Sequence, residues 1–196
     1  MRPLRPNPAL ALTVVLALAL LAGGCGSSPS DRASAPPDYE RALAGAPPRL
    51  AALYAQANEL LPGGLEAYER QLAELRGHPI VANVWASWCG PCRFEYPFFQ
   101  RAAAEYGKRV AFLGIDKQDD DDAARTFLRE EPVPYPSYED PDAAISDSIG
   151  ATLGMPDTAF YDSGGELVYL KQGPYDDFAE LRADIERHAL GGGEGG

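Results

Sequence analysis

Two of the chain's three cysteines, Cys89 and Cys92, stand one helical turn apart in the sequence Trp-Cys-Gly-Pro-Cys. A thiolate can attack a disulfide of another molecule, and a second thiol at this distance can then attack the mixed disulfide that results. The second attack closes an internal disulfide and releases the partner in reduced form. The spacing therefore predicts a redox centre with Cys89 as nucleophile and Cys92 as resolving thiol.

A strand and a helix must hold these thiols in place. Residues 80–86 are apolar and partly β-branched, which is typical of a buried strand in a parallel sheet. Cys89 then lies where the strand gives way to a helix, and Pro91 suits the first helical turn. Free backbone N–H groups and the helix dipole favour a thiolate there. We expect Cys89 to be the exposed thiol of low pKa and Cys92 to be covered.

The Trp-Cys-Gly-Pro-Cys motif, the following Glu95 and Pro97, and Gly-Met-Pro-Asp-Thr at 154–158 together resemble the thioredoxin superfamily. Within it, the chain is most similar to the TlpA/ResA-like, membrane-attached thiol-disulfide oxidoreductases, over roughly residues 77–190. The resemblance implies an α/β, thioredoxin-like fold: a central mixed β-sheet flanked by helices, with an N-terminal helical extension and a central insertion. It also implies that the Cys89–Cys92 disulfide needs no further cofactor.

The same resemblance implies a surface that grips an extended substrate. The Met155-Pro156 peptide bond is expected to be cis and to lie against the disulfide, since X-Pro is the common setting for cis bonds. Aromatic side chains serve cores and interfaces alike, so packing is an alternative role for the tryptophan of the motif. The substrate-binding residues expected on this basis are Trp88, Gly90, Pro91, Met155 and Pro156.

Proton transfer needs a group other than the one that thioredoxin uses. Thioredoxin buries an Asp six positions before its first cysteine, whereas this chain has Asn83, whose amide cannot act as a base. Glu95, one turn after Cys92, is the nearest acid in sequence and the candidate proton acceptor. The alternative is a solvated carboxylate in the first turns of the helix. As a base, Glu95 is expected to matter most at low pH.

The dipeptide between the cysteines bears on the direction of electron flow. Gly90-Pro91 matches thioredoxin, whose potential is about −270 mV, rather than the oxidant DsbA at about −120 mV. We therefore expect a reductant of protein disulfides, with apocytochrome c among the candidate substrates and a membrane dithiol donor to restore the thiols.

The N-terminus predicts export. Residues 1–24 combine two arginines with an apolar run, as in a signal peptide, and the run is short for a membrane span. Leu-Ala-Gly-Gly-Cys25 resembles a bacterial lipobox, although the usual Leu position holds Ala22. We expect acylated Cys25 and a flexible tether over 25–38, which place the domain at the extracytoplasmic face of the membrane. The alternative is a plain signal peptide with a free Cys25.

Helical spacing predicts two helices in an N-terminal extension over 39–76, the first running from Leu50 to Leu61 and the second over 65–75. The extension is expected to cover an edge of the sheet of the 77–190 domain, and a Gly-rich, disordered tail is expected at 191–196. Further strands are expected at 110–116, 157–161 and 166–170, and helices at 123–129, 142–149 and 178–190.

Other functions are weighed against this interpretation. A formal net charge of −12 opposes nucleic-acid binding. Zinc needs four ligands, and Cys25, His78 and His188 are not at ligand spacing to the cysteine pair, so no metal is expected. A thiol peroxidase usually has Thr three residues before its reactive cysteine, where Ala86 stands. Copper carriers of this fold usually have C-x-x-x-C, one residue longer than here. These two remain the alternatives to the oxidoreductase.

Overall fold

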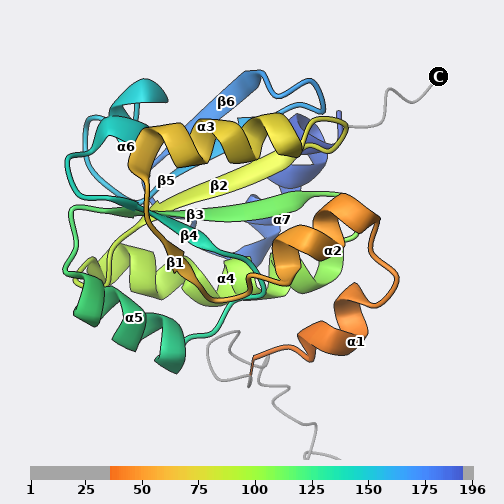
Figure 1. Ribbon diagram of the computed structural model, residues 1–196, viewed down its shortest axis with the longest axis horizontal. Helices are drawn as coiled ribbons and strands as arrows, with labels where there is room; N and C mark the ends of the chain where they lie inside the picture. The colour runs from red at the N-terminus through yellow and green to blue at the C-terminus, as the bar shows by residue number, and fades with distance from the viewer. Residues whose placement is uncertain (1–35, 192–196) are drawn as a thin grey trace, which may run out of the picture. The chain divides into compact units, whose positions relative to one another are not determined.

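The centre of the sheet is β2 (Ile80–Trp85), whose six residues are all buried. It pairs in parallel with β3 (Ala111–Lys117) and antiparallel with β5 (Asp157–Tyr161). Helices cover both faces of the sheet, which is why these strands are apolar almost throughout (Figure 1). The prediction of a central mixed sheet is confirmed.

The computed structural model describes residues 36–191. Within them the six strands follow the spatial order β1-β4-β3-β2-β5-β6 (Figure 1). The two edge strands are β1 (Leu60–Leu61) and β6 (Leu167–Gln172), and β4 (Ser137–Asp140) lies between β1 and β3. The expected signal peptide, Cys25, most of the tether and the tail from residue 192 lie outside the described residues.

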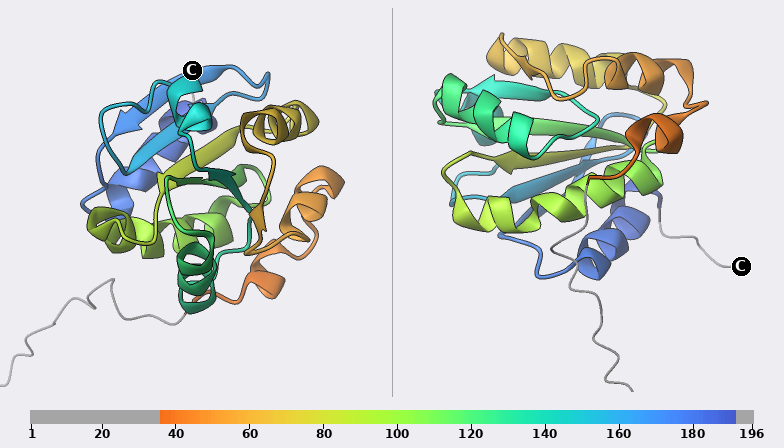
Figure 2. Two further views of the ribbon diagram at one scale, coloured as in Figure 1. Left: turned by 60° about the vertical axis from the view of Figure 1, so that its left-hand side comes forward. Right: turned by 90° about the horizontal axis from the view of Figure 1, so that it is seen from below.

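The main helices lie on the two faces of the sheet. On one face lie α4 (Gly90–Tyr106) and α7 (Phe178–Asp184), and on the other α3 (Gly64–Glu74) and α6 (Ala144–Ser148), as Figure 2 shows from two sides. The remaining helical segments are α1 (Tyr39–Leu43), α2 (Pro48–Tyr54), α5 (Asp121–Glu130) and a π-helix at Ile185–Ala189. Among residues 36–191, the helices are all too short or too polar to cross a bilayer.

The first predicted helix is wrong at its C-terminal end. It stops at Tyr54, and Leu60–Leu61 instead form β1, parallel to Ser137 and Tyr138 of β4. Asn58 makes the turn between them in the left-handed region, at φ 62°, and its amide donates to Leu128 O. Leu60 is buried, but as part of a strand, so the apolar spacing correctly predicted its burial and wrongly predicted its conformation.

Strand β4 was not predicted. The proline-rich segment before it, residues 131–136, is neither helix nor strand and leads into Ser137–Asp140, which pair in parallel with β3. Gly114 of β3 allows the close approach, since a Cβ there would lie 2.1 Å from the Ser137 hydroxyl oxygen. That hydroxyl accepts the indole N–H of the buried Trp85 at 3.1 Å. The N-terminal extension thus covers a sheet edge by adding a strand to it.

Candidate active site

The strand-to-helix junction after β2 holds the cysteine pair. Cys89 is the N-cap residue of α4 and Pro91 lies in the first turn, as the sequence predicts. The two cysteines form a disulfide with their Cα atoms 5.3 Å apart. The backbone N–H of Cys92 donates to the Cys89 sulfur at 3.2 Å, so this helix N-terminus already offers a hydrogen bond where a thiolate would form.

A groove of about 510 Å³ opens beside Cys89. In this disulfide form Cys89 is 4% exposed and Cys92 1%, so neither sulfur is broadly exposed, and only Cys89 reaches the groove. Trp88, 61% exposed, and Leu153, 85% exposed, place apolar surface at its walls. The lining residues are Trp88, Cys89, Gly90, Pro91, Lys117, Gln118, Thr152, Leu153, Gly154 and Met155.

Most of the residues expected to bind substrate lie together at this groove. The Met155-Pro156 peptide bond is cis, as predicted. Met155 lines the groove. Pro156 is buried and is not one of the lining residues, and its carbonyl accepts the N–H of Gly173 at 3.0 Å. Trp88 is not packed into the core: its indole N–H donates to Gln118 O at 3.1 Å and its ring stays exposed. Four of the five residues named from the resemblance therefore line one groove.

Glu95 is fully buried, so the alternative of a solvated carboxylate is wrong. Its two oxygens accept the Asn83 side-chain N–H at 2.9 Å and the Tyr175 backbone N–H at 2.8 Å. Burial raises the pKa of Glu95 to about 7, against the smaller opposing effect of these hydrogen bonds. A carboxyl group with a pKa near 7 can both accept and return a proton at neutral pH. Asn83 cannot act as a base, but its side-chain amide holds the Glu95 carboxyl group in place.

An acidic group beside the groove escaped the sequence analysis. In the acidic loop after β3, Asp120 is the N-cap residue of α5, and its side chain accepts the Ala123 N–H. Asp119, however, accepts hydrogen bonds from both the backbone N–H and the hydroxyl of Ser87, two residues before Cys89. Asp116 is buried, and burial with the nearby Asp119 charge raises its pKa to about 8. Asp119 therefore holds in place the backbone two residues before Cys89.

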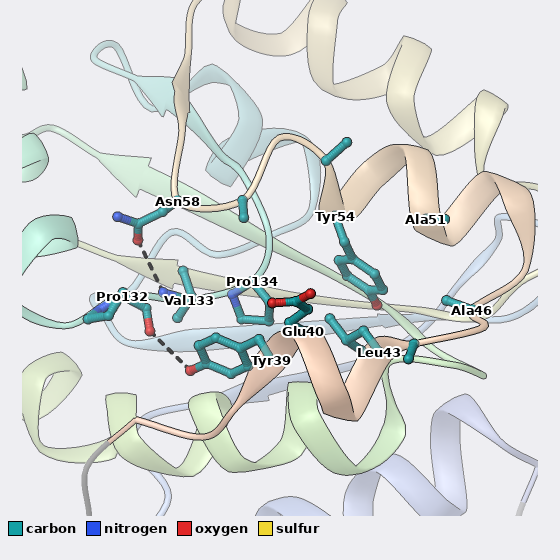
Figure 3. Close-up of a pocket in the computed structure, with 13 residues that line it drawn as sticks. Tyr39, Glu40, Leu43, Ala46, Ala51, Tyr54, Asn58, Pro132, Val133 and Pro134 are labelled. Atoms are coloured by element: carbon teal, nitrogen blue, oxygen red, sulfur yellow. Dashed lines mark hydrogen bonds between the residues drawn. The ribbon is translucent and has the colours of Figure 1, made fainter.

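A second hollow, of about 470 Å³, lies elsewhere on the molecule and shares no residue with the groove (Figure 3). Its walls come from α1, α2 and residues 132–134, and they are mostly apolar. The Tyr39 hydroxyl donates to Pro132 O at 3.0 Å across it. It contains no thiol. Among residues 36–191, no group of three His, Cys, Asp or Glu side chains could hold a metal ion.

Comparisons with known proteins agree with this site. The sequence is 39% identical over 96 residues to the thiol:disulfide interchange protein DsbE of Pseudomonas fluorescens biotype C, covering 48% of this chain and 52% of that protein. It is 31% identical over 106 residues to the thiol-disulfide oxidoreductase ResA of Oceanobacillus iheyensis, covering 53% and 54%. The chain thus spans about half the length of the curated relatives it matches.

A solved structure has the same fold. It is that of a secreted Mycobacterium tuberculosis disulfide oxidoreductase homologous to E. coli DsbE, 25% identical, with a TM-score of 0.53 over 59% of this chain and 85% of that one. The sequence profile of the Redoxin family matches residues 58–185, from the approach to β1 to the end of α7. This match includes the cysteine pair, Glu95 and the cis proline. The chain therefore belongs to the Redoxin family.

Proposed function

We propose that this protein is a thiol-disulfide oxidoreductase that reduces protein disulfides through Cys89 and Cys92. The observation that carries the proposal is the disulfide at the N-terminus of α4, with one of its two cysteines, Cys89, lining a groove. The similarity to a thiol:disulfide interchange protein and to a thiol-disulfide oxidoreductase supports the same chemistry.

The reaction runs from the dithiol form. The Cys89 thiolate attacks one sulfur of the substrate disulfide, a mixed disulfide forms, and the first substrate thiol leaves. Cys92 then loses its proton and attacks the Cys89 sulfur, which releases the second substrate thiol. Two electrons pass to the substrate, and the protein ends in the disulfide form described above. Glu95 is proposed to accept the proton of Cys92, since it is a buried carboxyl one turn further along α4 with a pKa of about 7.

Insulin reduction by the dithiol form tests this function. We expect turnover with the wild type and none with Cys89→Ser, whereas Cys92→Ser should stop at a mixed disulfide that can be isolated with its substrate. Peroxide consumption and copper titration, run beside it, test the peroxidase and copper-carrier alternatives. A strong response in either of those assays with none on insulin would overturn the proposal. A redox potential near that of DsbA, about −120 mV, would overturn the reducing direction.

We further propose an extracytoplasmic location at the bacterial membrane, with a lipid on Cys25. The signal-like residues 1–24 and the lipobox-like sequence before Cys25 support it. A membrane dithiol donor would then restore the thiols, and apocytochrome c is a candidate substrate. The native protein should fractionate with membranes and begin at Cys25, and Cys25→Ser should release it or leave the precursor uncleaved. A soluble native protein that begins elsewhere would contradict the anchor.

A further inference from the structure

Lys117, the last residue of β3, has no role in the chemistry described so far. Its side chain is 7% exposed, and its ammonium donates to Ala151 O at 2.8 Å. Ala151 is buried in the loop that leads to Met155 and Pro156. Lys117 thus joins the central sheet to the loop that forms one wall of the groove.

The groove has a single charged lining residue among the described residues, and it is Lys117. The remaining lining residues are uncharged: Trp88, Cys89, Gly90, Pro91, Gln118, Thr152, Leu153, Gly154 and Met155. Apolar walls keep water away from a charge and strengthen its attraction for an opposite charge. This positive charge stands out in a chain whose formal net charge is −12.

The ammonium of Lys117 is not fully used by the protein. It carries three N–H donors, of which the bond to Ala151 takes one. Asp157, which is also buried, is an acidic group that interacts electrostatically with Lys117. Burial raises the pKa of Asp157, and the positive charge of Lys117 lowers it. Asp157 itself accepts the Gly173 N–H at 3.3 Å, and within residues 36–191 no ion pair joins it to Lys117. Donors therefore remain for a ligand in the groove.

We propose that Lys117 is a specificity-determining residue that binds a carboxylate close to the disulfide of the substrate. The inference rests on the proposed function and adds a substrate class: disulfides with an Asp or Glu side chain next to the reacting cysteine. The net charge of this protein repels acidic partners at long range. Lys117 therefore selects a local feature of the substrate and not its overall charge.

The test uses the reduced, full-length protein and three short peptides. Each peptide has one cysteine in a mixed disulfide with 2-thiopyridine, a neutral leaving group, and differs only in the residue before it: Asp, Asn or Lys. Release of the thiopyridone gives the rate constant. We expect the Asp peptide to react about threefold to fivefold faster than the Asn peptide, because only one of the two paired groups, Lys117, is buried and the peptide carboxylate stays partly hydrated. The Lys peptide should react more slowly than either.

Variants separate the local charge from the net charge. Lys117→Gln should bring the Asp-to-Asn ratio to one, and Lys117→Arg should keep it. Lys108→Gln, at an exposed lysine after α4, changes the net charge equally and should leave the ratio as in the wild type. If a Lys117 variant does not fold, the wild type is measured at increasing salt concentration instead. Its Asp-to-Asn ratio of rate constants must then fall toward one, because salt screens the attraction between the charges. A wild-type ratio of one, or a ratio that Lys117→Gln preserves, would overturn the proposal.

Failure of the proposed function gives a different result. It would appear as no reaction of the wild type with the neutral Asn peptide. Peptides with Ser in place of Cys, titrated into the disulfide form, then decide the role of Lys117 from the fluorescence of the groove tryptophan, Trp88. Tighter binding of the Asp peptide that is lost in Lys117→Gln supports the inference, and equal binding of the Asp and Asn peptides overturns it.

Discussion

Replacing Glu95 with glutamine removes a carboxylate that the fold buries completely. In the folded protein its pKa lies at about 7 instead of the ordinary 4.5, chiefly because burial disfavours the charged form. The folded state therefore holds this proton more tightly than the unfolded chain does. Stability from this group is fully present below about pH 4.5 and is lost as the pH rises through about 7. At 1.36 kcal/mol per pKa unit, the loss is about 3 kcal/mol.

Glu95→Gln should abolish this loss. The glutamine oxygen can still accept the Tyr175 N–H, and Asn83 can turn its amide to receive the new NH₂ group. We therefore expect the free energy of unfolding of the variant, relative to wild type, to rise by about 3 kcal/mol between pH 4.5 and 8. Urea unfolding of the disulfide form at several pH values measures it. The raised pKa of Asp116 acts in both proteins and cancels in the difference.

Glu105→Gln is the matched control, because Glu105 is exposed on the same helix and the substitution makes the same change in charge. Its stability profile should run parallel to that of the wild type. If the profile of Glu95→Gln also runs parallel to wild type, the carboxylate does not titrate as its burial requires, and the reasoning is refuted.

The same pKa changes the expectation for catalysis. A carboxyl group accepts a proton only when it is ionised, and Glu95 is ionised mainly above pH 7. The loss of rate in Glu95→Gln should therefore be greatest above pH 7. The sequence alone led us to expect it at low pH, because it gave no sign of the raised pKa. The resolution step should slow on the order of 10²-fold, measured by rapid acid quench of the mixed disulfide. An unchanged pH profile would limit Glu95 to a structural role.

Three further results are expected. In the reduced protein, iodoacetamide should label Cys89 before Cys92, because only Cys89 lines the groove; peptide mass mapping measures the order, and the reverse would exchange their roles. Asp119→Asn should lower the free energy of unfolding by about 1–3 kcal/mol, because Ser87 loses a charged acceptor for two donors; an unchanged urea midpoint would contradict this. Gly114→Ala should cost about 1–3 kcal/mol by overpacking, since its Cβ would lie 2.1 Å from a side-chain oxygen of β4; an equally stable variant would show that β4 can move away.

The redox pair could be predicted because its chemistry and its local structure are encoded in adjacent residues. Three adjacent features all indicate a strand-to-helix junction: the apolar run of β2, the cysteine at the N-cap of α4 and the proline in its first turn. The cis bond before Pro156 followed from resemblance alone, and the structure has it. The acylated Cys25 stays a prediction, since it lies outside the described residues.

What could not be predicted depends on partners far away in the sequence. Leu60 and Leu61 pair with Ser137 and Tyr138. In so short an apolar segment, the local sequence does not distinguish a buried strand from a buried helix. The second hydrogen bond of Glu95 comes from Tyr175, 80 residues later, so its burial could not be seen from α4 alone. Lys117 looks like a solvated lysine beside an acidic loop until the groove is formed around it.

The two-residue strand β1 has a consequence for shortened forms of this protein. Backbone groups of Leu60 and Leu61, with the Glu59 carbonyl that accepts the Ser137 N–H at 2.8 Å, occupy the outer side of β4. A chain that began after Leu61 would keep every residue of the groove and leave the N–H and C=O row of β4 open. Open rows of this kind recruit strands from other molecules and lead to edge-to-edge aggregation. Very short edge strands offer a poor template, so β1 is at once the cover of the sheet and its safeguard against self-association.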